Sequence, residues 1–353
     1  MQEKGMKVNL ITFNAAITAL AKAAKRSKSP NANYPKSRRA EVENDGQLYQ
    51  RALQLLEQME RNNIKPDGFS YSSAISCCGA EGRWEEALEL MDRMRKGGPR
   101  TRPNRVAYTA AISACGRSGE YTNALRLFRD MKDEGLAADI VAYNALFNAL
   151  RVGKQPDVAY ELWEEMCGTK QSNATKAIAT ARADKGTVPD IITISDVIAT
   201  LAENGQKGYQ EKLDEVFTEA VERGVVLRSD TLDSTWEVDL SGMSFPVARA
   251  ACRYVLKKKL HFAIDELDDL TFITGVGVGN RPFAGKPVQS PPGTNRTVEQ
   301  SKYTSLRDYL QEEVLRDDFD PPIESFIPKR AQGMVQIDRS QLQRWARQNS
   351  SKQ

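Results

Sequence analysis

The feature of this sequence that most constrains its fold is a repeat of about 35 residues. In four segments a methionine follows an alanine by seven positions, and the intervals between successive methionines are 35, 37 and 35 residues. The four pairs are Ala52 and Met59, Ala87 and Met94, Ala124 and Met131, and Ala159 and Met166. A fixed period of this length is typical of solenoid proteins, in which each repeat buries its apolar face against its neighbours.

A second pattern lies upstream of each of these pairs and predicts another helix. An aromatic or apolar residue is followed by alanine, isoleucine or leucine at helical spacing. These opening residues are Phe13, Tyr71, Tyr108, Tyr143 and Ile194. Gly79 and Gly116 stand where we expect this first helix to end, and Gly82 and Gly119 precede the second helix. Each repeat is therefore predicted to be a helix–turn–helix unit, and four or five of them would stack into an α-solenoid.

Composition excludes several classes of protein. Apolar residues make up 40% of the 353 and charged residues 27%, which is enough to bury a core. No run reaches the roughly 18 apolar residues that a membrane helix needs, and a net charge of +3 favours no class of partner. One histidine, His261, and five cysteines without metal-ligand spacing argue against a zinc site, and the odd number argues against a disulfide framework. We therefore expect a reducing compartment and no metal.

These segments resemble the pentatricopeptide repeat family. The resemblance is carried by Val141–Leu146, Ile112–Gly119, Glu86–Met94 and Ile64–Asp67, and it spans residues 1 to about 228. The period of 35 separates the chain from the tetratricopeptide class, whose repeat is about 34 residues long. The resemblance implies a mainly α fold, a right-handed α-solenoid. Its repeats would occupy residues 10–67, 68–104, 105–139, 140–190 and, in degenerate form, 191–228.

Two of the repeats are longer than the period, which predicts surface insertions. We place one at 25–47, inside the first repeat, and the other at 168–186, at the end of the fourth. Between Lys22 and Arg39 there are seven basic residues and no acidic one. This stretch is either a solvated, disordered loop or an arm that contacts phosphates.

The first nine residues align without a gap on Met131–Asp139, the end of a later repeat. We therefore expect residues 1–9 to be the tail of a truncated repeat, with further repeats upstream. On this interpretation, the lack of a visible targeting peptide carries no information about localisation.

The resemblance also implies which residues would specify RNA bases. In this family the fifth residue of the first helix and the last residue of the repeat together recognise one base. The corresponding pairs are Asn14 with Asp67, Ser72 with Asn104, Thr109 with Asp139, and Asn144 with Asp190. By the family's code they resemble pairs that recognise U, A, G and U. The fifth repeat has Ser195, but its last residue, Arg228, breaks the code. The alternative is that these polar residues only cap helices and turns.

Other positions in the repeats are apolar or small. The second residue of each first helix is apolar, and it would either flank a base or pack between repeats; these residues are Ile11, Phe69, Val106, Val141 and Ile192. We expect Tyr71, Tyr108 and Tyr143 in the core between repeats. Cys78 and Cys115 occupy equivalent positions and are predicted to be packing residues.

After about residue 236 the pattern changes to short strands alternating with helices. Three strands are predicted, and they are Trp236–Leu240, Leu270–Ile273 and Met334–Ile337. Three helices are predicted at Val247–Lys259, Leu306–Leu315 and Arg339–Gln348. A Pro- and Gly-rich loop covers Arg281–Thr297. This order predicts a small α/β sandwich over residues 236–348.

The order and motifs of this segment resemble the small MutS-related domain. The family's Leu-Asp-x-His-Gly motif corresponds to Val238–Gly242, in which Asp239 is kept and Ser241 replaces the histidine. Its Thr-Gly-x-Gly motif is intact, and Thr274, Gly275 and Gly277 would contact nucleic acid, because glycine lets backbone N–H groups approach a phosphate. Some members cut nucleic acid. A serine hydroxyl is a poor general base, so Asp239 and Ser241 are only weak catalytic candidates.

Taken together, the resemblances imply a sequence-selective protein that binds single-stranded RNA in an organelle, and they favour the chloroplast over the mitochondrion. It would act in RNA processing, stability or translation, on organellar transcripts and with other RNA-processing proteins as further partners. No membrane, small-molecule substrate or cofactor is implied, apart from a divalent metal if the last domain is a nuclease. Two alternatives stay open, a site-selective endoribonuclease and a protein-binding scaffold.

Overall fold

The structure is a computed structural model, and it describes residues 9–27, 48–168, 187–203, 208–227, 235–259, 264–275, 305–328 and 333–350. The described residues divide into two compact units, one up to Val188 and the other from Pro189 onward. The predicted tail 1–9 lies outside the described residues except for Asn9. The same holds for most of the insertion 25–47 and nearly all of the insertion 168–186.

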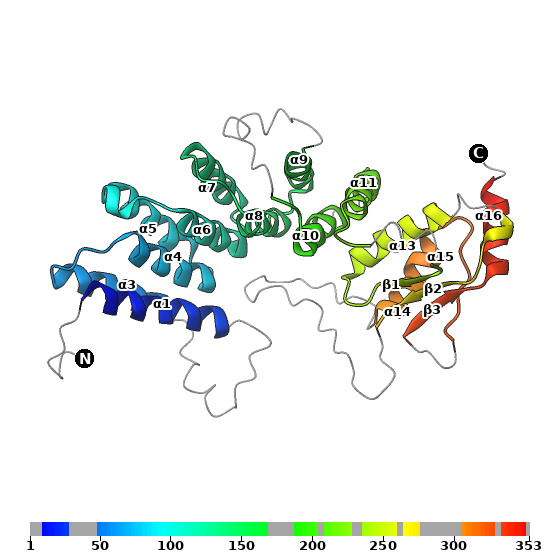
Figure 1. Cartoon of the computed structure of the whole chain (residues 1–353), viewed down its shortest axis with the longest axis horizontal. Helices are drawn as coiled ribbons and strands as arrows, with labels where there is room; N and C mark the ends of the chain where they lie inside the picture. The colour runs from blue at the N-terminus through cyan, green and yellow to red at the C-terminus, as the bar shows by residue number, and fades with distance from the viewer. Residues whose placement is uncertain are drawn as a thin grey trace, which may run out of the picture. The chain divides into compact units, whose positions relative to one another are not determined.

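The first unit consists of four helix pairs in two rows. The first helices of the pairs are α1 (Leu10–Ser27), α4 (Gly68–Glu81), α6 (Arg105–Ser118) and α8 (Ile140–Val152). The second helices are α3 (Leu48–Arg61), α5 (Trp84–Lys96), α7 (Tyr121–Asp133) and α9 (Pro156–Cys167). Each first helix packs on the next first helix, and α4, α6 and α8 lie side by side with α5, α7 and α9 beyond them (Figure 1). The predicted α-solenoid is confirmed.

The first helices begin and end where the sequence provides capping residues. Asp67, Asn104 and Asp139 are the N-caps of α4, α6 and α8, and each side chain accepts a hydrogen bond from the backbone N–H three residues later. Gly82 and Gly119 end α4 and α6 with φ of 72° and 77°, in the left-handed region that favours glycine. These repeat-ending residues, which the sequence predicts to specify bases, are therefore helix caps.

Gly79 and Gly116 do not end their helices, contrary to expectation. Both lie inside the last turns of α4 and α6 and are buried. A Cβ atom on Gly79 would lie 2.7 Å from the carbonyl oxygen of Ala110, and one on Gly116 would lie 3.0 Å from that of Ala145. The glycines are needed because successive first helices approach each other closely at these points.

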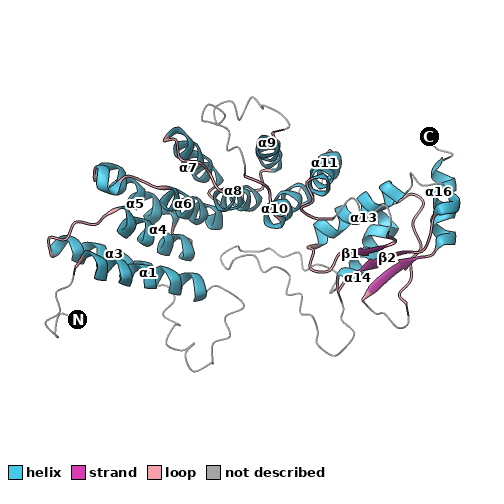
Figure 2. Ribbon diagram, in the orientation of Figure 1, coloured by secondary structure: helices cyan, strands magenta, loops and turns pink. Residues whose placement is uncertain are grey.

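The second unit begins with a helix pair, α10 (Ile191–Ala202) and α11 (Tyr209–Glu222), and continues into a small α/β domain (Figure 2). Its strands are β1 (Glu237–Asp239), β2 (Leu270–Ile273) and β3 (Met334–Ile337). Its longer helices are α13 (Phe245–Lys259) and α16 (Arg339–Ser350). Between β2 and β3, α14 (Leu306–Tyr309), a π-helix (Leu310–Val314) and α15 (Leu315–Asp317) form one continuous helical segment. All three predicted strands and all three predicted helices are present.

The strands form one sheet in the order β1-β2-β3. β1 and β2 are parallel, with Glu237 opposite Thr271, and β2 and β3 are antiparallel, with Leu270 opposite Ile337. The central strand β2 buries Leu270, Thr271 and Phe272, so both of its faces are covered. A parallel pair places the carboxyl ends of β1 and β2 at the same edge, where both predicted motifs begin.

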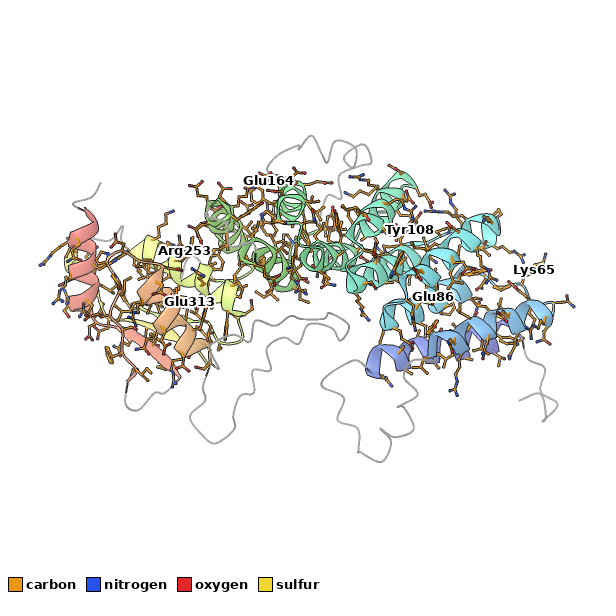
Figure 3. All side chains as sticks on the ribbon, turned by 180° about the vertical axis from the view of Figure 1, so that it is seen from behind. Lys65, Glu86, Tyr108, Glu164, Arg253 and Glu313 are labelled. Carbon is orange, nitrogen blue, oxygen red and sulfur yellow. The ribbon has the colours of Figure 1, made fainter. Side chains whose placement is uncertain are left out.

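The helix pair α10–α11 is part of the same compact unit as the α/β domain, because both helices pack on α13. The rings of Phe217 on α11 and Tyr254 on α13 have centroids 5.7 Å apart. Arg253 of α13, labelled in Figure 3, lies 3.4 Å from Asp214 of α11 and 3.9 Å from Asp318, which follows α15. The change in sequence pattern near residue 236 therefore does not coincide with the division between units, which falls at Pro189.

Candidate nucleic-acid interface

Apolar side chains are exposed at one repeated position on the first helices. Ile11 is 75% exposed, and Phe69, Val106 and Val141 are each 56–58% exposed. These are the second residues of α1, α4, α6 and α8. Packing between repeats, one of the two roles that the sequence left open, is therefore wrong for these residues. Ile192, the second residue of α10 in the other unit, is 56% exposed as well.

A hollow of about 520 Å³ lies between two of these exposed side chains, Ile11 and Phe69. Asn14, the predicted base-specifying residue of the first repeat, lies in its lining, and Lys22 contributes a positive charge. Two apolar walls with an amide between them are suited to a flat, partly apolar ligand with polar edges.

Asn14 and Asp67 are in direct contact, as the predicted pair requires. Asn14 Nδ2 donates to Asp67 Oδ1 over 3.3 Å, and Ser70 Oγ lies 2.6 Å from Asn14 Oδ1 and 2.8 Å from Asp67 Oδ1. Burial acts to raise the pKa of Asp67, but the hydrogen bonds from Ser70 and Asn14 outweigh it and lower the pKa. Asp67 is therefore a charged acceptor at neutral pH.

Ser72 and Asn104, the second pair, are also in contact but less accessible. Ser72 Oγ lies 3.2 Å from Asn104 Oδ1, yet it donates over a shorter distance, 2.6 Å, to the backbone carbonyl of Gly68. Ser72 is buried, whereas Asn104 is half-buried. Because one hydroxyl has one proton, the serine is largely satisfied within its own helix.

Thr109 and Asp139, the third pair, line a second hollow, of about 420 Å³, together with the exposed Val106 and Val141. The Thr109 hydroxyl is buried and makes no hydrogen bond to any residue that the structure describes. Asp139 Oδ1 accepts from the backbone N–H of Ala142, and Oδ2 lies 3.4 Å from Arg105 Nε. A buried hydroxyl without a partner costs free energy.

The fourth pair is divided between the two units. Asn144 lies half-buried on α8 in the first unit, and Asp190 is the N-cap of α10 in the second, where it accepts from Thr193 N over 2.9 Å. Ser195 is half-buried on α10. The pairing of Asn144 with Asp190 stays a prediction, and Arg228 lies outside the described residues.

The tyrosines and cysteines of the first helices lie in the core, as predicted. Tyr71, Tyr108 and Tyr143 are buried, and the Tyr108 hydroxyl, labelled in Figure 3, lies 3.1 Å from Arg95 and 2.7 Å from Glu134. Cys78 and Cys115 are fully buried, and burial raises the pKa of Cys115 to about 12. None of these side chains is available for base stacking or nucleophilic chemistry.

Basic side chains lie beside both hollows. Lys22 lines the first, while Lys25, Arg105 and Arg117 line the second. Lys22, Lys25 and Arg26 belong to the last turns of α1. This helix extends to Ser27, so the first residues of the predicted insertion 25–47 are helical. The other four basic residues of that stretch, Lys28, Lys36, Arg38 and Arg39, lie outside the described residues. Arg105 and Arg117 were not singled out from the sequence, although Arg105 directly follows Asn104, a residue of the second predicted pair.

The motif residues of the α/β domain converge at the carboxyl edge of β1 and β2. A Cβ atom on Gly275, whose φ is 85°, would lie 2.8 Å from Ser241 Cβ, so glycine lets the two loops touch. Asp239 Oδ1 accepts from Ser241 N over 2.8 Å, and the Thr274 hydroxyl donates to the carbonyl of Gly333. Gly277 lies outside the described residues. Asp239 and Thr274 thus maintain the local backbone.

Two further features limit what these surfaces could be. Over the described part of the chain, no set of three or more His, Cys, Asp or Glu side chains is arranged to hold a metal ion. None of the described helices combines the length and the apolar character that a membrane span requires. Among the described residues, Asp239 therefore does not belong to such a set.

Comparison with known families identifies the repeats. Family models described as "PPR repeat family", "Pentatricopeptide repeat domain" and "PPR repeat" match residues 103–152, 54–118 and 141–168. Residues 54–168 are therefore pentatricopeptide repeats, as the sequence predicted. No curated protein matches the chain.

Several solved structures are similar to this chain at low identity. The pentatricopeptide repeat protein PPR10 from maize matches with 20% identity and a TM-score of 0.42, over 73% of this chain and 29% of that one. PPR10 in complex with an 18-nt psaJ RNA element matches with 20% identity and a TM-score of 0.40, over 73% and 33%. The PPR domain of Arabidopsis thaliana protein-only RNase P 1 in complex with tRNA matches with 14% identity and a TM-score of 0.40, over 56% and 93%. This chain thus spans less than a third of maize PPR10.

Proposed function

We propose that this protein binds single-stranded RNA and recognises one base per repeat, in the order U, A, G, U. Pentatricopeptide repeats are modules in which two or three side chains per repeat contact one base. The observation that supports this proposal best is the pair of hollows on the first helices. Each combines two exposed apolar walls, a base-specifying residue and a basic side chain.

The chemistry of these hollows favours RNA over a protein partner. Base–apolar contacts and hydrogen bonds to base edges need flat apolar walls with a few polar groups, and the backbone needs cations. Exposed Ile11, Phe69, Val106 and Val141 recur at one position per repeat, which suits a ligand that is itself periodic. A protein-binding scaffold would not require the contact between the two residues of each pair, Asn14 with Asp67 and Ser72 with Asn104.

We infer that the protein acts in an organelle, and we favour the chloroplast over the mitochondrion. There it would act in the processing, stability or translation of organellar transcripts, with other RNA-processing proteins as partners. This inference depends on the family resemblance. Fractionation of organelles with an antibody against this chain tests it, and recovery outside both organelles would contradict it.

For the α/β domain we propose the small MutS-related fold and a role in contacting RNA backbone, without cleavage. Asp239 accepts from the backbone of Ser241, and the histidine that its motif would supply is absent, so no general base is placed beside it. We expect no RNA product when the protein is incubated with RNA and Mg²⁺ or Mn²⁺. Metal-dependent cleavage abolished by Asp239→Asn would instead establish the endoribonuclease.

The coded recognition is tested by filter binding. The RNA contains 5′-UAGU-3′ and is compared with its single-base variants at two salt concentrations. By the family's code, Asn144→Ser should move the preference at the fourth base from U to G, because serine would then be paired with Asp190. Asn148→Ser, on the same helix, is the control and should leave the preference unchanged.

Three outcomes of this experiment distinguish the proposed function from its alternatives. A fourth-base preference that moves from U to G in Asn144→Ser supports coded recognition. Equal affinity for every RNA, abolished by salt, would mean contact with the backbone alone and would contradict it. No binding to any RNA would point to the protein-binding scaffold.

A further inference from the structure

Arg105 occupies a distinctive position among the first helices. It is the first residue of α6 and follows Asn104, which belongs to the second base-specifying pair. The equivalent residues of α1, α4 and α8 are Leu10, Gly68 and Ile140, none of which carries a charge. Arg105 Nε lies 3.4 Å from Asp139 Oδ2, in the third pair, and the arginine side chain is 57% exposed. One cation therefore lies next to the residues of two base-specifying pairs.

The hollow beside Arg105 is lined by polar groups whose hydrogen-bonding capacity is not fully used. Asp139 uses Oδ1 to cap α8, so Oδ2 is the oxygen that faces Arg105. Thr109, in the same hollow, has a hydroxyl without a hydrogen bond to the described residues. The hydroxyls of Ser72, Ser76, Thr200 and Thr218, by contrast, each bond to the carbonyl four residues earlier. The third repeat therefore places a carboxylate oxygen and a guanidinium around one space, with the buried Thr109 hydroxyl beside them.

We propose that Arg105 is a third specificity-determining residue of the third repeat. Its guanidinium donates a hydrogen bond to the carbonyl oxygen of a base, and the ring N–H of the same base donates a hydrogen bond to Asp139. The proposal rests on the proposed function, namely that this hollow binds one base of single-stranded RNA.

The arrangement of donor and acceptor separates guanine and uracil, which have a ring N–H beside a carbonyl oxygen, from adenine and cytosine, which do not. Guanine presents O6, an acceptor, beside N1–H, a donor, and this matches a guanidinium beside a carboxylate. Adenine presents an amino donor beside the acceptor N1, so the guanidinium would face a donor and the carboxylate a lone pair. Mismatched polar groups in a partly desolvated site cost more than the lost hydrogen bond. Arg105 thus favours guanine over adenine in addition to any selection by Thr109.

A purely structural role for Arg105 is a poor explanation. The ion pair with Asp139 is long and exposed, and such pairs contribute little to folding stability. Asp139 caps α8 through its other oxygen, so the cap does not need Arg105. Removing the guanidinium should leave the fold intact.

The test measures affinity for four RNAs that differ only at the third base of 5′-UAGU-3′. Arg105→Gln should weaken binding to the guanine RNA about tenfold, the effect of one hydrogen bond from a charged group. Its affinity for the adenine and cytosine RNAs should change much less. Arg105→Lys keeps the charge but loses the planar fork and should also lose part of the preference for guanine. Arg129→Gln, an exposed arginine on α7, removes the same charge and should change nothing.

Each other outcome has a definite meaning. Equal weakening for all four RNAs, with a smaller salt dependence and full rescue by Arg105→Lys, would show contact with a phosphate and overturn the proposal. Unchanged binding in Arg105→Gln, while the wild type still discriminates bases, would overturn it and leave the proposed function standing. If the wild type binds no RNA, or all RNAs equally, the proposed function itself fails. Matching thermal melts for all variants confirm that each is folded.

Discussion

At the scale of single residues, a side chain's accessibility decides what it does, and the sequence does not report accessibility. Ser72 and Thr109 occupy the same position in successive repeats. Ser72 is buried and its hydroxyl donates to the Gly68 carbonyl, whereas Thr109, which lines a hollow, has a buried hydroxyl without a hydrogen bond to the described residues. Both were equally good candidates from the sequence, because spacing identifies a position on a helix and not the hydrogen bonds made there. Arg105 was missed for the same reason.

Val106 shows what exposure predicts for an apolar residue. Val106→Ser should weaken binding to the UAGU RNA about fivefold, because an apolar wall against a base is lost, at roughly 1 kcal/mol. Its free energy of unfolding should change by less than about 0.5 kcal/mol, since the side chain is mostly outside the core. Filter binding and urea unfolding measure the two effects. Val158→Ser on α9 is the binding control, and a large loss of stability in Val106→Ser would show that the residue packs between repeats after all.

The burial of the cysteines predicts which thiols react in the folded protein. Cys77, Cys78, Cys115 and Cys252 are buried, and Cys167 is half-buried. Burial raises the pKa of Cys77 and of Cys115 to about 12, so at pH 8 only about one such thiol in ten thousand is ionised. With a disulfide reagent at pH 8, we expect Cys167 alone to react quickly in the native protein and all five thiols to react in urea. Fast reaction of two or more thiols in the folded state would contradict this burial.

At the scale of elements, the second helices are joined by ion pairs from one repeat to the next. Arg93 on α5 lies 2.7 Å from Glu60 on α3, and Arg95 on α5 lies 2.6 Å from Asp130 on α7. Lys132 on α7 lies 2.8 Å from Glu165 on α9. Arg95 and Asp130 are 35 residues apart, one repeat, so the period could have indicated this contact. The other two pairs span 33 residues and needed the structure, because they depend on how each helix is rotated.

These ion pairs should differ in strength because they differ in burial. Lys132 is 5% exposed and Glu165 17%, whereas Glu60 is 47% exposed. Glu165→Ala should lower the free energy of unfolding by about 3 kcal/mol, because it removes a carboxylate that lies 2.8 Å from the buried Lys132 ammonium. Glu60→Ala should cost less than about 1 kcal/mol. Urea unfolding of both variants measures the difference. An equal loss in the free energy of unfolding would show that burial does not determine the strength of these ion pairs.

At the scale of the whole molecule, local patterns located the main helices and strands, whereas the division between compact units does not fall where the pattern changes. Strand alternation and helical spacing identified β1, β2, β3, α13 and α16 because those signals depend on nearby residues. The end of the 35-residue period near Arg228 indicated a boundary there. The division between compact units, at Pro189, depends on α10 and α11 packing on α13, a contact between residues about 40 apart, as in Arg253 and Asp214. No local pattern carries that information.

The same packing predicts that α10, α11 and the α/β domain open together. Arg253→Ala removes the side chain between Asp214 on α11 and Asp318, which is 6% exposed. Hydrogen exchange should then speed up in both α11 and α13 by about tenfold, as expected for a loss of roughly 1.4 kcal/mol, and stay unchanged in α4–α7. Arg223→Ala removes an ion pair to Glu219 within α11 and is the control, with no expected effect on α13. Faster exchange in α11 alone would mean that the predicted fifth repeat is stable independently of the α/β domain, and the sequence boundary near residue 236 would then be the correct one.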